Sequence, residues 1–104
     1  YLSAKLYFDF DQYKAADVAL NNSLEKYPDS KYREELMYML LKSKYLLAIR
    51  SIQEKQEVRL SSALDEYFTF IDEYPDSKYK KEVDRFYSVT AKMLNYNEEE
   101  TNIN

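Results

Sequence analysis

Hydrophobic residues recur at helical spacing along most of the chain. Three stretches, residues 12–27, 56–74 and about 77–95, place apolar side chains at every third or fourth position, which is typical of a helix with one buried face. Residues 1–10 are typical of the end of another helix, and the alternation expected of a strand is confined to residues 7–11. The pattern therefore predicts an all-α fold.

The segment from about residue 30 to residue 51 has a different pattern. Apolar side chains cover nearly all sides of its middle, from Leu36 to Leu41 and again from Tyr45 to Ile49. A helix that is apolar most of the way round packs on several sides at once. We therefore expect this helix to be the spine of the domain, followed by a polar connector at residues 53–57.

Two identical tetrapeptides, Tyr-Pro-Asp-Ser at residues 27–30 and 74–77, interrupt the helices. Proline cannot continue a helix, and it moves the preceding residue away from helical dihedral angles. The Asp or Ser that follows can accept hydrogen bonds from the first free N–H groups of the next helix. Each tetrapeptide therefore predicts a corner at which one helix ends and another begins.

The corners belong to a longer internal repeat. The hexapeptide at residues 27–32 recurs unchanged at residues 74–79, and the same offset of 47 residues aligns the preceding helical stripes. In both copies a small residue is followed four positions later by a large one, and Pro comes eight positions after that. These structural repeat positions are Ala16, Leu20 and Pro28, and Ala63, Tyr67 and Pro75. The spacing predicts a tetratricopeptide-like helical solenoid of about five helices in antiparallel pairs, with a period longer than the usual value of about 34 residues.

Composition narrows the possible chemistry. The 104 residues form one domain with a formal charge of −4, and they include no Gly, Cys or His. These absences remove glycine-rich phosphate loops, thiol nucleophiles, His-based catalysis and the usual zinc sites. The adjacent carboxylate pairs, such as Glu34 and Glu35, point in different directions on a helix and do not form a glycosidase-like pair. We expect no catalytic residues, no metal and no cofactor.

Charge and hydropathy also limit the partners. Three of the acids, Glu98 to Glu100, lie in a polar tail, so the rest of the chain is nearly neutral and offers no basic surface for nucleic acid. No apolar run reaches the roughly 18 residues that a membrane span needs. We expect a helical domain over residues 1–96 and a disordered polar tail over residues 97–104. The start at Tyr1, with no Met, indicates a piece of a longer protein.

Twelve tyrosines are the most unusual feature of the composition. Most of them are expected to pack between helices with the hydroxyl group reaching water. In solenoids of this type the first helix of each pair lines the inner surface, and Tyr1, Phe8 and Tyr38 lie on such helices. These three residues are the candidates for contact with a protein partner.

Three runs, at residues 27–35, 42–48 and 67–75, resemble the C-terminal part of the BamD family. These are the tetratricopeptide-repeat lipoproteins of the bacterial outer-membrane β-barrel assembly machinery. The resemblance implies a non-catalytic scaffold at the periplasmic face of the outer membrane, held there by an N-terminal lipid outside this chain. It implies docking on the POTRA region of BamA and on other subunits of the machinery. Soluble periplasmic coordinators of the Tol–Pal-associated type share the corner motif, so such a coordinator, or a generic peptide-binding adaptor, is the alternative.

Overall fold

Five helices account for nearly all of residues 2–9 and 12–103, the part of the chain that the computed structural model describes. They are α1 (Leu2–Asp9), α2 (Tyr13–Lys26), α3 (Arg33–Ile49), α4 (Gln53–Glu73) and α5 (Lys80–Ile103). Side chains are described for residues 4–9 and 12–95. These ranges contain no strand, and the all-α prediction is confirmed.

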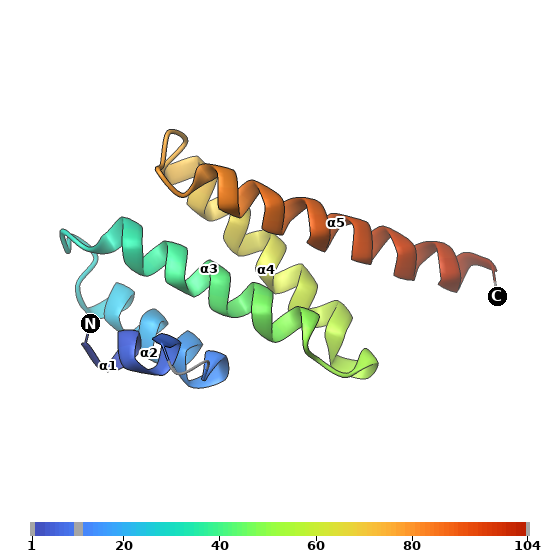
Figure 1. Ribbon diagram of the computed structural model, residues 1–104, viewed down its shortest axis with the longest axis horizontal. Helices are drawn as coiled ribbons and strands as arrows, with labels where there is room; N and C mark the ends of the chain where they lie inside the picture. The colour runs from blue at the N-terminus through green and yellow to red at the C-terminus, as the bar shows by residue number, and fades with distance from the viewer. Residues whose placement is uncertain (1, 10–11, 104) are drawn as a thin grey trace.

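Successive helices run in opposite directions and pack side by side (Figure 1). Each helix contacts the next one along the chain, and α3 also contacts α5, the first helix after the second corner. Short connections favour this arrangement because a helix that follows a short loop packs antiparallel to the preceding helix. The tetratricopeptide-like architecture predicted from the repeat is confirmed. None of the described helices has the length and apolar character needed to cross a membrane.

Helix α3 is the spine of the domain because its two sides belong to two different hydrophobic clusters. One side supplies Leu36, Met39 and Leu40 to a cluster with α1 and α2. The other side supplies Met37 and Leu41 to a cluster with α4 and α5. The near-absence of polar residues in the middle of this helix follows from that double burial.

The two Tyr-Pro-Asp-Ser corners have the same backbone geometry. Tyr27 has φ −129° and ψ 68°, and Tyr74 has φ −129° and ψ 67°. In each corner the Ser hydroxyl accepts a hydrogen bond of 3.1 Å from the N–H of the residue two positions later, at Ser30 in one copy and Ser77 in the other. Pro28 and Pro75 follow the two tyrosines and so occupy equivalent places, each between the end of one helix and the start of the next.

The other repeat positions differ in how deeply they are buried. Ala16 and Leu20 are fully buried on α2, and Ala63 is 2 % exposed on α4. Tyr67 is only partly buried, because its hydroxyl leaves the contact to donate a hydrogen bond of 2.7 Å to Asp84 on α5. Small residues at helix crossings let two backbones approach, which is what the alanines permit here.

Two stretches differ from the sequence-based expectation. The polar connector expected at residues 53–57 is wrong, because these residues form the first turns of α4 and only Arg50–Ile52 link the two helices. Gln, Glu and Lys are good helix formers, so a polar stretch can start a helix that is buried only further along. Helix α5 also continues through residues 97–103, where a tail was expected. The division of the chain at residue 96 stays a prediction.

Candidate protein-binding site

Side chains from α1, α3, the turn before α5 and the first turn of α5 meet on one side of the domain. They are Phe8, Tyr38, Lys42, Tyr79 and Glu82, and we refer to them as the inner-face cluster. All five are partly exposed. The cluster therefore combines aromatic surface with a charged pair that a partner can reach.

Tyr38 is the centre of this cluster. Its ring stacks on Tyr79 with 3.9 Å between ring centroids and an angle of 6° between the planes. Its hydroxyl donates to the carboxylate of Glu82, with oxygen–oxygen distances of 3.0 and 2.9 Å. Burial raises the pKa of the Tyr38 hydroxyl, and so does the hydrogen bond to Glu82. Tyr38 thus stays a neutral donor that links α3 to α5.

Lys42 joins the aromatic side chains to the acid. Its Nζ atom lies 3.1 Å from Glu82 Oε2 and 3.3 Å from the Tyr38 hydroxyl oxygen. It also lies 5.9 Å from the ring centroid of Phe8 and 5.7 Å from that of Tyr38, within the range of a cation–π interaction. Burial opposes the charge of Lys42, but the hydrogen bonds to Glu82 and Tyr38 outweigh it and raise its pKa.

The structure brings together two of the three residues predicted to contact a partner. Phe8 and Tyr38 both flank Lys42, whereas Tyr1 lies outside the described residues. Lys42 and Glu82 were not predicted to be part of the site. The spacing of four residues between Tyr38 and Lys42 on one helix was a usable signal, but the link to Glu82 depends on how α3 packs against α5.

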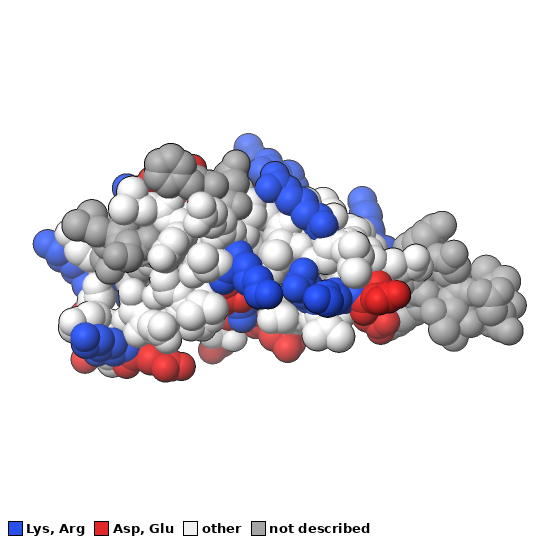
Figure 2. Space-filling view, turned by 90° about the horizontal axis from the view of Figure 1, so that it is seen from below, with Lys and Arg blue, Asp and Glu red and all other residues white. Residues whose placement is uncertain are grey.

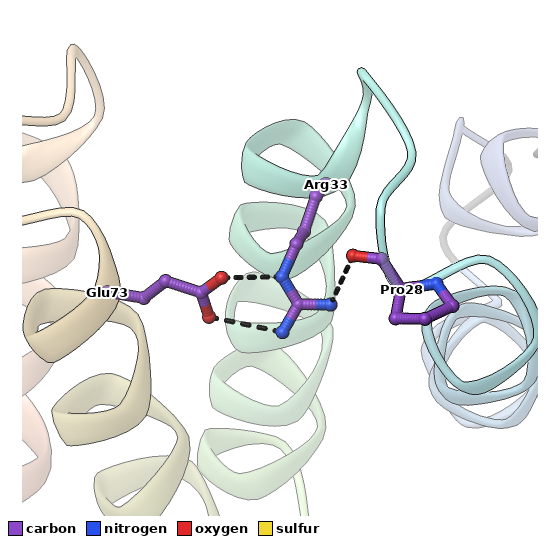
Figure 3. Close-up of polar contacts among 3 residues, drawn as sticks. All are labelled: Pro28, Arg33 and Glu73. Carbon is purple, nitrogen blue, oxygen red and sulfur yellow. Dashed lines mark hydrogen bonds and ion pairs between the residues drawn. The ribbon is translucent and has the colours of Figure 1, made fainter.

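A second polar contact ties the end of the first corner to the end of α4 (Figure 3). Arg33 donates from Nε and Nη2 to the two carboxylate oxygens of Glu73, at 2.5 and 3.1 Å, and from Nη1 to the carbonyl oxygen of Pro28 at 3.1 Å. Ser77 in the second corner donates to Glu34 at 2.7 Å. These contacts join the two corners and so fix the spacing between the two repeat units.

The acidic side chains in these contacts are held in ion pairs and hydrogen bonds. The carboxylates of Glu73, Glu82 and Asp84 are engaged by Arg, Lys or Tyr side chains across or along helices. Among the described residues, no group of three or more acidic side chains is placed to hold a metal ion. The geometry consists of aromatic side chains held in position by hydrogen bonds, which suits the recognition of another protein.

Helical hairpins that end in proline corners and pack on a shared central helix define a tetratricopeptide-like helical protein. A family model described as YfiO, outer membrane lipoprotein, matches residues 1–102. The chain belongs to this family, which places it at the periplasmic face of the bacterial outer membrane and indicates a role in outer-membrane assembly. A comparison with curated proteins finds no match.

Proposed function

We propose that this protein is a non-catalytic scaffold of the outer-membrane β-barrel assembly machinery, of the BamD type, and that its inner face docks the POTRA region of BamA. Family membership supports the setting, since the matched family consists of outer membrane lipoproteins. The observation that carries the proposal is the inner-face cluster. It presents partly exposed aromatic side chains that are already held by internal contacts.

Prior ordering of these side chains favours binding. Tyr38 is fixed by its stack on Tyr79 and its hydrogen bonds to Glu82, so a partner that covers it pays little entropy for immobilising it. Aromatic residues with a polar rim are the usual energetic centres of protein interfaces. Stacked helical pairs add rigidity, because each unit is supported by its neighbours.

The proposal is tested by measuring the affinity of the full-length protein for a soluble protein that contains the POTRA region of BamA. We expect Phe8→Ala to weaken binding by about tenfold, the loss of about 1.4 kcal/mol that an interface anchor gives. Tyr27→Ala is the matched control, because Tyr27 is 58 % exposed at the first corner and lies outside the inner-face cluster. Circular dichroism of each variant verifies that the helices are intact.

Two outcomes would overturn the proposal. The first is that the intact parent protein does not bind the POTRA region at all. The second is that Phe8→Ala and Tyr27→Ala weaken binding to the same extent. Absence of binding together with a cleaved signal that lacks a lipid-accepting Cys upstream of this chain would favour the soluble coordinator instead.

A further inference from the structure

A pocket of about 650 Å³ lies between the start of α2 and the turn that joins α3 to α4. Its lining includes Lys14 and Val18 from α2, Leu47 and Arg50 from the end of α3 and its turn, and Arg59 from α4. We refer to it as the α2 pocket. It shares no residue with the inner-face cluster, although Phe8 of that cluster contacts Tyr13 at its edge, with 6.1 Å between ring centroids.

The charge around the α2 pocket has one sign. Lys14, Arg50 and Arg59 contribute three positive charges, and no Asp or Glu is among the described residues that line it. None of these three cations forms an ion pair within the described part of the chain. Within residues 12–95, therefore, three cations surround one hollow without an acidic partner in its lining.

The two arginines are held at the edge of the hollow by neutral contacts. The guanidinium carbon of Arg50 lies 5.2 Å from the ring centroid of Tyr13. Arg59 donates from Nη1 to the hydroxyl of Ser51 at 2.7 Å, and that hydroxyl donates to the carbonyl oxygen of Leu47 at 2.6 Å. Guanidinium groups fixed in this way keep N–H donors available, and their planar geometry matches a carboxylate.

The hollow between the cations has an apolar component. Val18 is 60 % exposed, and both Val18 and Leu47 line the pocket. Figure 2 shows the molecule from the side on which α2 and the α3–α4 turn lie. Lys and Arg side chains lie near the middle of this face, at its left end and along its upper edge, and acidic side chains lie along its lower edge and to the right of the central cations.

We propose that the α2 pocket binds an acidic segment of a partner protein, one that inserts an apolar side chain against Val18 and Leu47 and places flanking carboxylates on Arg50 and Arg59. The inference goes beyond the proposed function, because it assigns a second docking site and the chemistry of what occupies it. Charge complementarity gives such a segment both orientation and a faster encounter with the site.

A protein segment fits these features better than an anionic membrane surface does. A membrane presents a broad negative plane, and the acidic side chains on this face would repel it. A single extended segment or helix turn can enter the hollow, whose described lining contains no Asp or Glu. The apolar side chains of the lining also favour contact with an inserted aliphatic side chain, and a phosphate group makes no such contact.

The test uses the isotope-labelled full-length protein and a blocked peptide, acetyl-Glu-Leu-Asp-Leu-amide, titrated to low-millimolar concentration. We expect amide chemical-shift changes only in residues 12–18, in residues 47–51 and in the part of α4 around Arg59. The isosteric peptide acetyl-Gln-Leu-Asn-Leu-amide should bind more weakly by about tenfold, and added salt should weaken only the acidic peptide.

Substitutions of the cations test whether the acidic peptide binds at the α2 pocket. The pair Arg50→Gln with Arg59→Gln should reduce affinity for the acidic peptide by about tenfold, as expected for two lost charge-assisted contacts. The pair Lys31→Gln with Lys78→Gln removes the same charge from the two exposed corners and should leave affinity unchanged. Lys14→Gln breaks none of the contacts that hold the arginines, so it keeps the test informative if the arginine pair destabilises the fold.

Three results would overturn the inference. They are shift changes outside the α2 pocket, equal binding of the acidic and amide peptides, and no binding of either peptide. Binding of phosphatidylglycerol vesicles that is lost in the arginine pair, with no peptide binding, would assign the pocket to lipid. If the protein bound the POTRA region but not the acidic peptide, this inference would be wrong and the proposed function would be unaffected.

Discussion

Arg33 illustrates how one side chain can set the distance between two repeat units. Its guanidinium group binds Glu73 at the end of α4, 40 residues away, and the carbonyl oxygen of Pro28 in its own corner. The repeat-equivalent residue, Lys80, instead pairs with Asp84 four residues further along the same helix. The long-range contact therefore belongs only to the first copy.

We expect Arg33→Lys to lower the free energy of unfolding by about 1 kcal/mol, because Lys cannot make the bidentate contact and the pair is only partly buried. Chemical denaturation gives the value. Lys80→Ala is the control and should cost about 0.3–0.5 kcal/mol, the usual worth of a helical ion pair at that spacing. If Glu73→Gln lowered stability equally with and without Arg33, the two side chains would not be coupled and the assignment would fail.

The Tyr67 hydroxyl contributes to the stability of the fold by an amount that depends on pH. Burial and then the hydrogen bond to Asp84 raise the pKa of Tyr67 from 10.0 to about 12. The pKa of Asp84 is lowered from 3.8, first by Lys80 and then by Tyr67. The stabilising effect of the Tyr67 hydroxyl is therefore complete below pH 10.0 and is lost as pH rises through about 12. At the acidic end it is present above pH 3.8 and lost as Asp84 becomes protonated.

Tyr67→Phe keeps the ring that stacks on Tyr87 at 4.7 Å but removes the hydroxyl. We expect the difference in unfolding free energy between parent and variant to be constant from pH 3.8 to 10.0 and to shrink above and below. Ultraviolet titration of the tyrosines should show a component with a pKa of about 12 that is missing in the variant. Tyr27→Phe is the control and should retain that component. A difference that does not change with pH would contradict the contact with Asp84.

Two buried alanines occupy equivalent repeat positions on α2 and α4. Ala16 on α2 and Ala63 on α4 are 0 % and 2 % exposed. Ala16→Glu or Ala63→Glu would bury an unpaired carboxylate, and we expect a loss of about 3 kcal/mol or more, a large part of the total stability of a small domain. Thermal unfolding followed by circular dichroism measures it.

The controls for these substitutions lie on the same helices. Asn22→Glu on α2 and Ser61→Glu on α4 introduce the same side chain at exposed positions and should change the melting temperature little. If Ala16→Glu or Ala63→Glu melted within about 2 °C of the parent, these alanines would not be close helix contacts.

The helices were predictable because their apolar period and the two prolines act within a few residues of each other. The start of α4 was not, since residues 53–57 are polar and give no apolar period, although their helix propensity is good. Phe8 and Tyr38 were selected as candidates from their place in the repeat, and the structure places both beside Lys42. Their link through Lys42 to Glu82 depends on the packing of α3 on α5, which no local pattern specifies.

The α2 pocket shows the same limit. Arg50 and Arg59 are nine positions apart and each looks like an ordinary surface cation in the sequence. They come to one hollow only because the link between α3 and α4 is three residues long and α4 folds straight back. Sequence periodicity fixes which face of a helix is buried, but the grouping of exposed charges is decided by the turns.

Two hydrophobic clusters share α3. This organisation predicts how deletions from the C-terminal end change the stability of the protein. The members of both clusters that the structure describes lie between Ala4 and Phe86, so deleting residues 97–104 leaves them in place. We expect the shortened protein to melt within about 2 °C of the parent. Deleting residues 77–104 instead removes Val83 and Phe86 and uncovers Phe70 and Met37, at a cost of about 1.5–3 kcal/mol for each large side chain.

Because a solenoid is stabilised by neighbouring units, the larger deletion should loosen α4 while α1, α2 and one side of α3 keep their own cluster. Hydrogen exchange would then show fast exchange in α4 and retained protection around Leu20 and Leu40. Equal loss of protection in all helices would mean that the two clusters form one cooperative core. A large drop in melting temperature on deleting residues 97–104 would place the end of the domain beyond residue 96.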